Sequence, residues 1–169
     1  NRVYDGTVTA TLGGTASVTP IGLDAVTVTG TGSGSFATKH VGTNKPVTVT
    51  GFSLTGGDAG NYSIVQPTGL TANITPAPLS VSTSNVVRQY DGTTNASGTA
   101  VVTAGTLFAG DSLTGGAFSF ADRHVGTGKT VNVSGIAVND GNGGNNYTLT
   151  QVANTGSTIN IRPVSNWTG

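Results

Sequence analysis

The sequence contains no cysteine and no methionine in its 169 residues. Without cysteine the chain forms no disulfide and offers no thiolate to a metal ion. A cytosolic protein usually keeps a few thiols, whereas a chain that crosses an outer membrane unfolded benefits from having no cross-links. The absence of cysteine, together with the abundance of threonine, serine and glycine, therefore favours an exported bacterial protein.

Charged residues are also scarce, at 8% of the chain, and the formal net charge is zero. No basic stripe or acidic tail stands out in the sequence. Both observations argue against nucleic acid or an anionic membrane surface as a partner. No apolar run approaches the ~18 residues that a membrane-spanning helix needs, so we expect no insertion into a membrane.

What the sequence does contain is typical of β-sheet. Threonine and valine are stiff about their first side-chain torsion and fit a pleated surface better than a helix. The 27 glycines, together with asparagine, supply turns. Hydrophobic residues make up 35% of the chain and alternate with polar ones in segments such as Pro46–Thr50 and Thr130–Ser134, whereas no segment shows convincing helical periodicity. We therefore predict an all-β protein.

The chain carries an internal duplication. Four anchor segments recur in the same order, 84 to 87 residues apart, as expected of duplicated domains whose loops have changed length. The four pairs are Tyr4–Thr7 with Tyr90–Thr93, Phe36–Lys45 with Phe120–Lys129, Asn61–Ile64 with Asn146–Leu149, and Ile74–Pro76 with Ile161–Pro163. The signature residues are Tyr4, Asp5, Gly6, Val41, Gly42, Asn61 and Tyr62 in copy one, and Tyr90, Asp91, Gly92, Val125, Gly126, Asn146 and Tyr147 in copy two.

The boundary between the copies is predicted at Pro76 and Pro78, because two prolines so close together form a short, stiff hinge. The copies then span 1–78 and 79–163, with 164–169 as a tail or the start of a further repeat. Leu79–Ser82 alternates apolar and polar residues and predicts the first strand of copy two. Asn1 lies only three residues before Tyr4, so we expect copy one to lack this strand, which was either removed or is contributed otherwise.

Strands of both copies can be placed from the alternation. In copy one it predicts strands at 25–29 and 46–50, and in copy two at 79–84, 86–90, 98–104, 112–120, 129–138, 146–152 and 157–162. Seven short strands separated by turn clusters predict a small β-sandwich-like module in each copy. A β-grasp-like module with one short helix is the alternative.

These anchors resemble the YDG and MBG-type repeats of filamentous-haemagglutinin-like adhesins of Gram-negative bacteria. The resemblance covers nearly the whole chain and departs mildly from the pattern at Thr38, Asn44 and the insertion Asp140–Gly144. It implies many copies in series, secretion through an outer-membrane pore and a role as a stalk or spacer at the outer cell surface, with neighbouring repeats as partners. The alternative is a module that itself binds a glycan or a host matrix surface.

Each YDG segment is interpreted as a structural turn. Tyr4 and Tyr90 are expected to pack as core aromatics, while the aspartate of each segment bonds nearby N–H groups and the following glycine adopts a positive φ. The alternative for Asp5 and Asp91 is a carboxylate that receives a cation or substrate. No Ser-His-Asp order, phosphate-binding loop or zinc protease motif is present, so we expect no catalytic residue and no cofactor.

Three other constellations carry a chemical alternative. His40 and His124 are equivalent, but neither has further ligands at zinc spacing, so a hydrogen-bonded loop histidine is expected. Calcium binding is conceivable at the loop of Asp140, although seven acidic residues spread over two copies do not readily supply its six to eight oxygens. Lys45 and Lys129, with an asparagine and an aspartate, could form an intramolecular isopeptide bond if buried together, whereas solvated turn lysines are the simpler interpretation.

Overall fold

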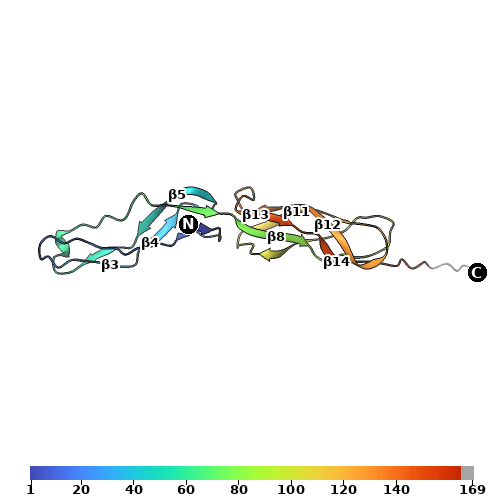
Figure 1. Ribbon diagram of the computed structural model, residues 1–169, viewed down its shortest axis with the longest axis horizontal. Helices are drawn as coiled ribbons and strands as arrows, with labels where there is room; N and C mark the ends of the chain where they lie inside the picture. The colour runs from blue at the N-terminus through green and yellow to red at the C-terminus, as the bar shows by residue number, and fades with distance from the viewer. Residues whose placement is uncertain (165–169) are drawn as a thin grey trace, which may run out of the picture. The chain divides into compact units, whose positions relative to one another are not determined.

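The computed structural model describes residues 1–164 and divides into two compact units, unit 1 (Asn1–Thr75) and unit 2 (from Pro76 onward) (Figure 1). Strands predominate in both, which confirms the predicted all-β class. The one helical element is a 3-10 turn, η1 (Ala59–Asn61), and residues 1–164 contain no α-helix, so the β-grasp-like alternative lacks its helix. Of the predicted tail 164–169, all but Val164 lies outside the described residues.

Unit 2 consists of two sheets. The four-stranded sheet has the order β11 (Ser112–Phe120), β12 (Gly126–Asn139), β14 (Asn154–Asn160) and β9 (Val87–Gln89). The three-stranded sheet has the order β10 (Ala100–Gly105), β8 (Ala77–Thr83) and β13 (Tyr147–Gln151). The pairs β14–β9 and β13–β8 are parallel, and the other pairs are antiparallel.

The core of unit 2 is built from alternate residues of its strands. In β8 the side chains of Leu79 and Val81 are 1% and 0% exposed. A second group comprises Val86, Phe120, Val131 and Ile159, all at most 6% exposed, with Tyr90, Ala96 and Phe118 packed against it. β8 is the central strand of its sheet, so it supplies both buried side chains and backbone partners to β10 and β13.

Pro78 belongs to β8 and not to the connection between the units, which corrects the predicted two-proline hinge. The Ala77 N–H donates to Asn146 O on the β13 side, so the nitrogen of Pro78 faces the β10 side. On that side the ladder with β10 ends at the pair Leu79–Gly105. Position 78 therefore needs no backbone N–H donor, and a proline is tolerated there. Pro76 alone separates β8 from the last strand of unit 1, β7 (Thr71–Thr75).

Unit 1 contains a counterpart of the four-stranded sheet of unit 2, with one additional strand at its edge. Its five-stranded sheet has the order β1 (Arg2–Val3), β7, β5 (Gly42–Thr50), β4 (Ser33–Phe36) and β2 (Thr9–Ala10). β3 (Thr27–Thr29) and β6 (Ser53–Thr55) form a separate hairpin ladder. In unit 2 the same hairpin is continuous, because β11 pairs from end to end with residues 131–139 of β12.

A pair of facing glycines bends this hairpin in each unit. Gly30 and Gly51 of unit 1 have φ of 84° and 95°, and a Cβ added to Gly30 would lie 2.3 Å from Gly51 O. Gly115 and Gly135 take the corresponding places in unit 2, with φ of 69° and 68°. After Gly135 the buried side of β12 changes from odd-numbered to even-numbered residues, so one strand serves two parts of the core.

Unit 1 has no strand in the place that β8 takes in unit 2. Residues 14–19 and 62–66, which correspond to β10 and β13, are irregular instead. Residues 62–66 nevertheless keep their position: Gln66 bonds both the N–H and the C=O of Phe52, as Gln151 accepts from the N–H of Ile136. Irregular backbone at these two segments follows from the missing central strand, because a ladder needs a partner.

The structure corrects one of the four predicted anchor pairs. Ile74 lies opposite Arg2, as Ile159 lies opposite Arg88, and the Tyr4 N–H bonds Thr75 O as the Tyr90 N–H bonds Asn160 O. Ile159 is therefore the counterpart of Ile74, and Ile161 is not. The shared Ile-x-Pro pattern misled the alignment because unit 2 has two more residues between its last strand and the proline.

Candidate functional site

The YDG segment of each unit is a side-chain-capped turn. Asp5 Oδ1 accepts the N–H and the hydroxyl of Thr7 at 2.8 and 2.9 Å. Asp91 Oδ1 accepts the same two groups of Thr93, both at 2.9 Å. Gly6 and Gly92, with φ of 77° and 79°, provide the left-handed step that closes each turn.

The tyrosine of each segment anchors the turn to the sheet. Its N–H donates to the last strand of the unit, at 2.8 Å for Tyr4 and 2.9 Å for Tyr90. Tyr4 is 1% exposed, whereas Tyr90 is half-buried against the Phe120 group. The ring of Tyr4 also lies under the ammonium of Lys39, 5.6 Å from its centroid.

An arginine two residues before the tyrosine completes the turn, and sequence reasoning missed it. Arg2 forms an ion pair with Asp5, with 2.6 Å between Nη1 and Oδ2, and Arg88 pairs with Asp91. Each guanidinium also lies over a core phenylalanine, 5.3 Å from the ring centroid of Phe36 for Arg2, and 5.0 Å from that of Phe120 for Arg88. Its recurrence at the same offset in both copies is the signal that could have identified it.

These contacts lower the pKa of both aspartates. The hydrogen bond from Arg88, followed by the two bonds from Thr93, lowers the pKa of Asp91 to about 2. For Asp5, burial acts in the opposite direction, but the bonds from Thr7 and the charge of Arg2 together lower its pKa below the usual value. Both carboxylates are thus held ionised by donors from their own turn.

The second signature tyrosine of each unit closes a different loop. Tyr147 Oη donates to Asp111 Oδ2 at 2.7 Å and accepts the Phe108 N–H at 3.0 Å. Tyr62 Oη likewise donates to Asp24 Oδ2 at 2.7 Å and accepts the N–H of Ile21 at 2.9 Å. The Ile21 bond lowers the pKa of Tyr62, but the bond to Asp24 and other causes raise it more, so the pKa lies above its usual value.

Asn61 and Asn146 differ between the units. Asn146 is fully buried and its N–H donates to Asp140, while its Oδ1 accepts from Asn142 at 2.9 Å. Asp140 also accepts the N–H groups of Asn142 and Gly144, at 2.7 and 2.9 Å. Burial opposes the shift, but these three N–H bonds lower the pKa of Asp140. The loop proposed for calcium is thus ordered by its own donors, whereas Asn61 is exposed in η1.

Lys129 is not the solvated turn residue that was predicted. Its ammonium pairs with Asp122, and its side chain is only 12% exposed. Lys45 makes the equivalent contact in unit 1, donating to the hydroxyl of Thr38 at 3.0 Å. Thr38 stands where unit 2 has Asp122, so the hydrogen bond is kept but the negative charge is absent. The bond from Lys129 is the main cause of the lowered pKa of Asp122. The amide of Asn146 bonds other partners, so these contacts do not join the lysine to the asparagine as an isopeptide bond would need.

The valine-glycine signature lies where a long strand begins. Gly42 opens β5 and Gly126 opens β12, while Val41 is half-buried and Val125 is 46% exposed. The preceding histidine belongs to the same turn, because the N–H of His124 donates to Asp122 Oδ1 at 2.9 Å. No group of three or more His, Asp or Glu side chains that could hold a metal ion occurs within residues 1–164.

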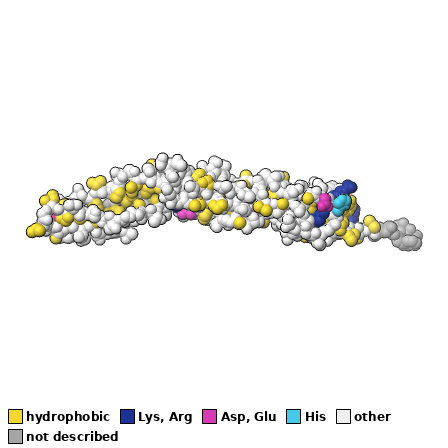
Figure 2. Space-filling view, viewed as in Figure 1, with side chains coloured by type: hydrophobic (Ala, Val, Ile, Leu, Met, Phe, Trp, Pro, Cys, Tyr) yellow, Lys and Arg dark blue, Asp and Glu magenta, His cyan; other side chains and the backbone are white. Residues whose placement is uncertain are grey.

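In both units the signature residues lie in or beside three polar clusters, and unit 2 has a fourth in the loop of Asp140. The groups of these clusters mostly satisfy one another. The first cluster is the YDG turn with its arginine, the second is the tyrosine–aspartate pair, and the third is the lysine contact that opens β5 or β12. On the face shown in Figure 2 charged side chains are few, and most of those visible gather near the C-terminal end of unit 2. Within the described part of the chain, no helix is long and apolar enough to cross a bilayer.

The YDG domain family matches residues 1–69 and 75–156, one match in each unit. No curated protein and no solved structure matches the chain. The first matched range lies within unit 1 and the second covers most of unit 2, and each contains one YDG turn, with its arginine and its tyrosine–aspartate pair. The chain therefore belongs to the YDG domain family, with two copies of the domain in tandem.

Proposed function

We propose that the chain is a segment of the stalk of a secreted or surface-attached bacterial adhesin. Its modules act as spacers that project a distal binding region away from the outer surface of a Gram-negative cell. The partners of each module are the neighbouring modules of the same chain. The spacer role requires no catalysis and no cofactor.

The connection between the two modules carries this proposal. β7 ends at Thr75 and β8 begins at Ala77, so a single proline links the closing strand of one module to the central strand of the next. Pro76 has a fixed φ and restricts the residue before it, which leaves few free torsions. A linker of this kind limits the motion of consecutive modules, as a spacer requires.

The chemistry of the polar clusters supports the same proposal. The carboxylates of Asp5, Asp91 and Asp140 bind donors from their own loops instead of pointing to a shared cleft. A cysteine-free chain of zero net charge also suits export in an unfolded state and resists association with charged surfaces. These properties favour a structural role over a catalytic one.

Small-angle X-ray scattering tests the spacer role. Doubling the 169-residue chain in tandem should increase the maximum dimension about two-fold if the linkers are stiff. A matched variant with six Gly-Ser residues inserted between Thr75 and Pro76 should gain less length per module and scatter as a flexible chain. Equal behaviour of the two chains would contradict the proposal.

A glycan array and a panel of matrix proteins test the alternative, a module that binds directly. A spacer gives no saturable binding on either surface. Saturable binding that a soluble sugar competes away, and that survives mutation of the linker, would assign the adhesive function to the modules themselves.

A further inference from the structure

We propose that unit 1 carries an acceptor groove for one additional β-strand of the Ala77–Val86 type, which enters on the side of Asn1. The occupant is an extended segment with apolar side chains at alternate positions, joined in the same chain ahead of Asn1. This inference concerns the fold of the module and does not depend on the stalk function.

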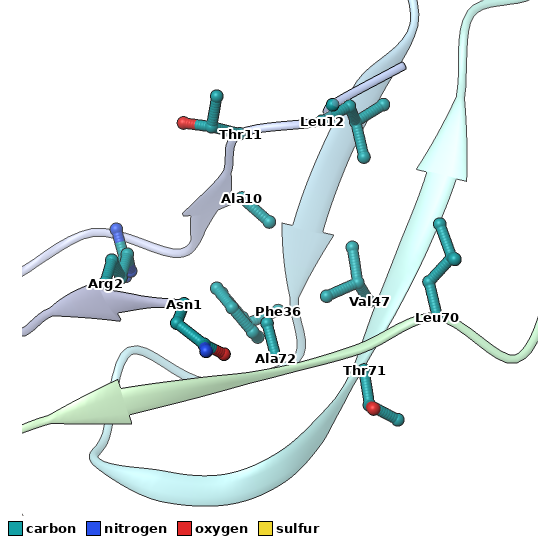
Figure 3. A pocket seen from close by; sticks show the side chains of 11 residues that line it. Asn1, Arg2, Ala10, Thr11, Leu12, Phe36, Val47, Leu70, Thr71 and Ala72 are labelled. Atoms are coloured by element: carbon teal, nitrogen blue, oxygen red, sulfur yellow. The ribbon is translucent and has the colours of Figure 1, made fainter.

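The first pocket of the groove is a hollow that a valine fills in unit 2. It is lined by Ala10, Phe36 and Val47, and in Figure 3 the side chains of Ala10 and Leu12 face those of Val47 and Leu70. The counterparts of Ala10, Phe36 and Val47 in unit 2 pack around Val86, which is 6% exposed. Because Arg2 corresponds to Arg88, the counterpart of Val86 falls at the position immediately before Asn1.

Two further pockets continue the groove along the hairpin. The middle pocket has Val49 and Phe52 at its base, with Ala16 and Pro67 at its sides. In unit 2, Val81 lies between Val102 and Gln151, the counterparts of Ala16 and Gln66. The middle pocket is therefore the place of a residue equivalent to Val81.

The last pocket corresponds to Leu79. Its base is formed by Phe52 and Leu54, and Ile64 lies along one side. Leu79 of unit 2 is paired with Leu149, the counterpart of Ile64. Neighbouring pockets share residues, with Leu12 and Leu70 common to the first two, and Phe52 and Pro67 common to the last two. The three pockets therefore form one continuous groove.

The walls of the groove are exposed in the way that an absent strand would leave them. Ile136 and Val138 of unit 2 are 3% and 6% exposed, whereas their counterparts Phe52 and Leu54 are only half-buried. Ile64 is 36% exposed at the wall that corresponds to β13, whereas its counterpart Leu149 is half-buried beside β8. Hydrophobic side chains accordingly gather on the face of unit 1 in Figure 2.

The entry side follows from the first pocket. Asn1 and Arg2 line it, so a chain that leaves the groove there continues directly into β1. In unit 2, β8 continues into β9 in the same way, with only residues 84–86 between them. The same direction gives a parallel pairing with residues 62–66, as β8 has with β13.

The test adds the ten residues Ala77–Val86 ahead of Asn1 of the full chain and measures amide hydrogen exchange. Exchange of residues 14–19 and 62–66 should slow by about ten-fold or more, because both segments gain a ladder partner. The matched control carries aspartate at the added positions equivalent to Leu79 and Val81 and should give no protection. Unchanged exchange with the added segment, or equal protection by the aspartate control, would overturn the proposal.

A cross-link fixes the register independently, since the chain has no cysteine of its own. Ser80 pairs with Thr150 in unit 2, and Val65 is the counterpart of Thr150. Val65→Cys combined with cysteine at the added position equivalent to Ser80 should form an intramolecular disulfide, and cysteine at the position equivalent to Ser82 should form far less. A disulfide that joins two chains would show that the strand comes from a second copy, and the arrangement proposed would be wrong.

Discussion

The hydroxyl group of Tyr147 donates a hydrogen bond to the carboxylate of Asp111 at 2.7 Å, although 36 residues separate them in the chain. The same oxygen accepts the N–H of Phe108, so one phenol holds the loop between β10 and β11 against β13. Tyr62 and Asp24 repeat the contact in unit 1. The pair therefore belongs to the module itself, and it gives a test of how the module is held together.

Tyr147→Phe should lower the free energy of unfolding of unit 2 by about 1–3 kcal/mol, because a bond to a charged group is lost and the Phe108 N–H loses its acceptor. Urea unfolding followed by NMR signals of each unit measures the change. Tyr62→Phe is the matched variant, and its cost should be smaller because Tyr62 is less buried than Tyr147. Equal stability of Tyr147→Phe and the parent chain would show that the phenol only packs.

The lowered pKa of Asp91 predicts a loss of stability in acid. The carboxyl has its ordinary pKa of 3.8 in the unfolded chain and a pKa of about 2 in the folded chain. From about pH 5 downward the unfolded state therefore binds more protons, and the free energy of unfolding of unit 2 falls until the pH passes below 2. Unfolding of the parent chain and of Asp91→Asn should be compared from pH 6 to pH 2.

The advantage of the parent chain over Asp91→Asn should shrink as the pH falls through this window. Arg88→Gln is the control, because it removes the main cause of the shift and should weaken the pH dependence that belongs to Asp91. An advantage that stays constant from pH 6 to pH 2 would exclude Asp91 as a source of acid sensitivity.

The strands could be predicted from the sequence because their alternation is local. The expected strand 112–120 coincides with β11, and 129–138 lies within β12. Arg2 and Arg88 were missed because their role depends on Phe36 and Phe120, which the chain brings back from more than thirty residues away. Alternation says which side of a strand is buried, but it does not say which strand lies beside it.

The same limit explains two of the corrections. Ile161 shares a pattern with Ile74, but the pairing of β14 with β9 makes Ile159 the counterpart. Pro78 resembles a linker residue by type, and its place in β8 depends on where the β10 ladder stops. Both errors arise because strand pairing depends on residues far away in the sequence.

The central position of β8 predicts a large cost for truncating its side chains. Leu79 is 1% exposed, and Leu79→Ala should lower the free energy of unfolding of unit 2 by about 2–5 kcal/mol through lost burial and the remaining cavity. Leu70→Ala in unit 1 is the control, since Leu70 is 43% exposed and should cost less than about 1 kcal/mol. Chemical denaturation with separate signals for each unit measures both, and similar costs would mean that β8 contributes little to the core.

The facing glycines of the hairpin predict a graded series of substitutions. Gly30→Ala places a Cβ at φ 84° and 2.3 Å from Gly51 O, so it combines backbone strain with a backbone clash. Gly92→Ala carries a similar φ of 79° but has nothing within 4 Å, so its cost should be the strain alone, about 1–2 kcal/mol. Gly60→Ala has neither and should be close to neutral.

Thermal and urea unfolding of the three variants should therefore rank Gly30→Ala as the least stable and Gly60→Ala as the most stable. The clash involves backbone atoms on both sides, so the hairpin must open for the Gly30→Ala chain to fold. We expect this variant to lose the β3–β6 ladder, visible as rapid amide exchange over residues 27–29 and 53–55. Intact protection there would mean that the bend tolerates a side chain and that the glycine pair is not what shapes the hairpin.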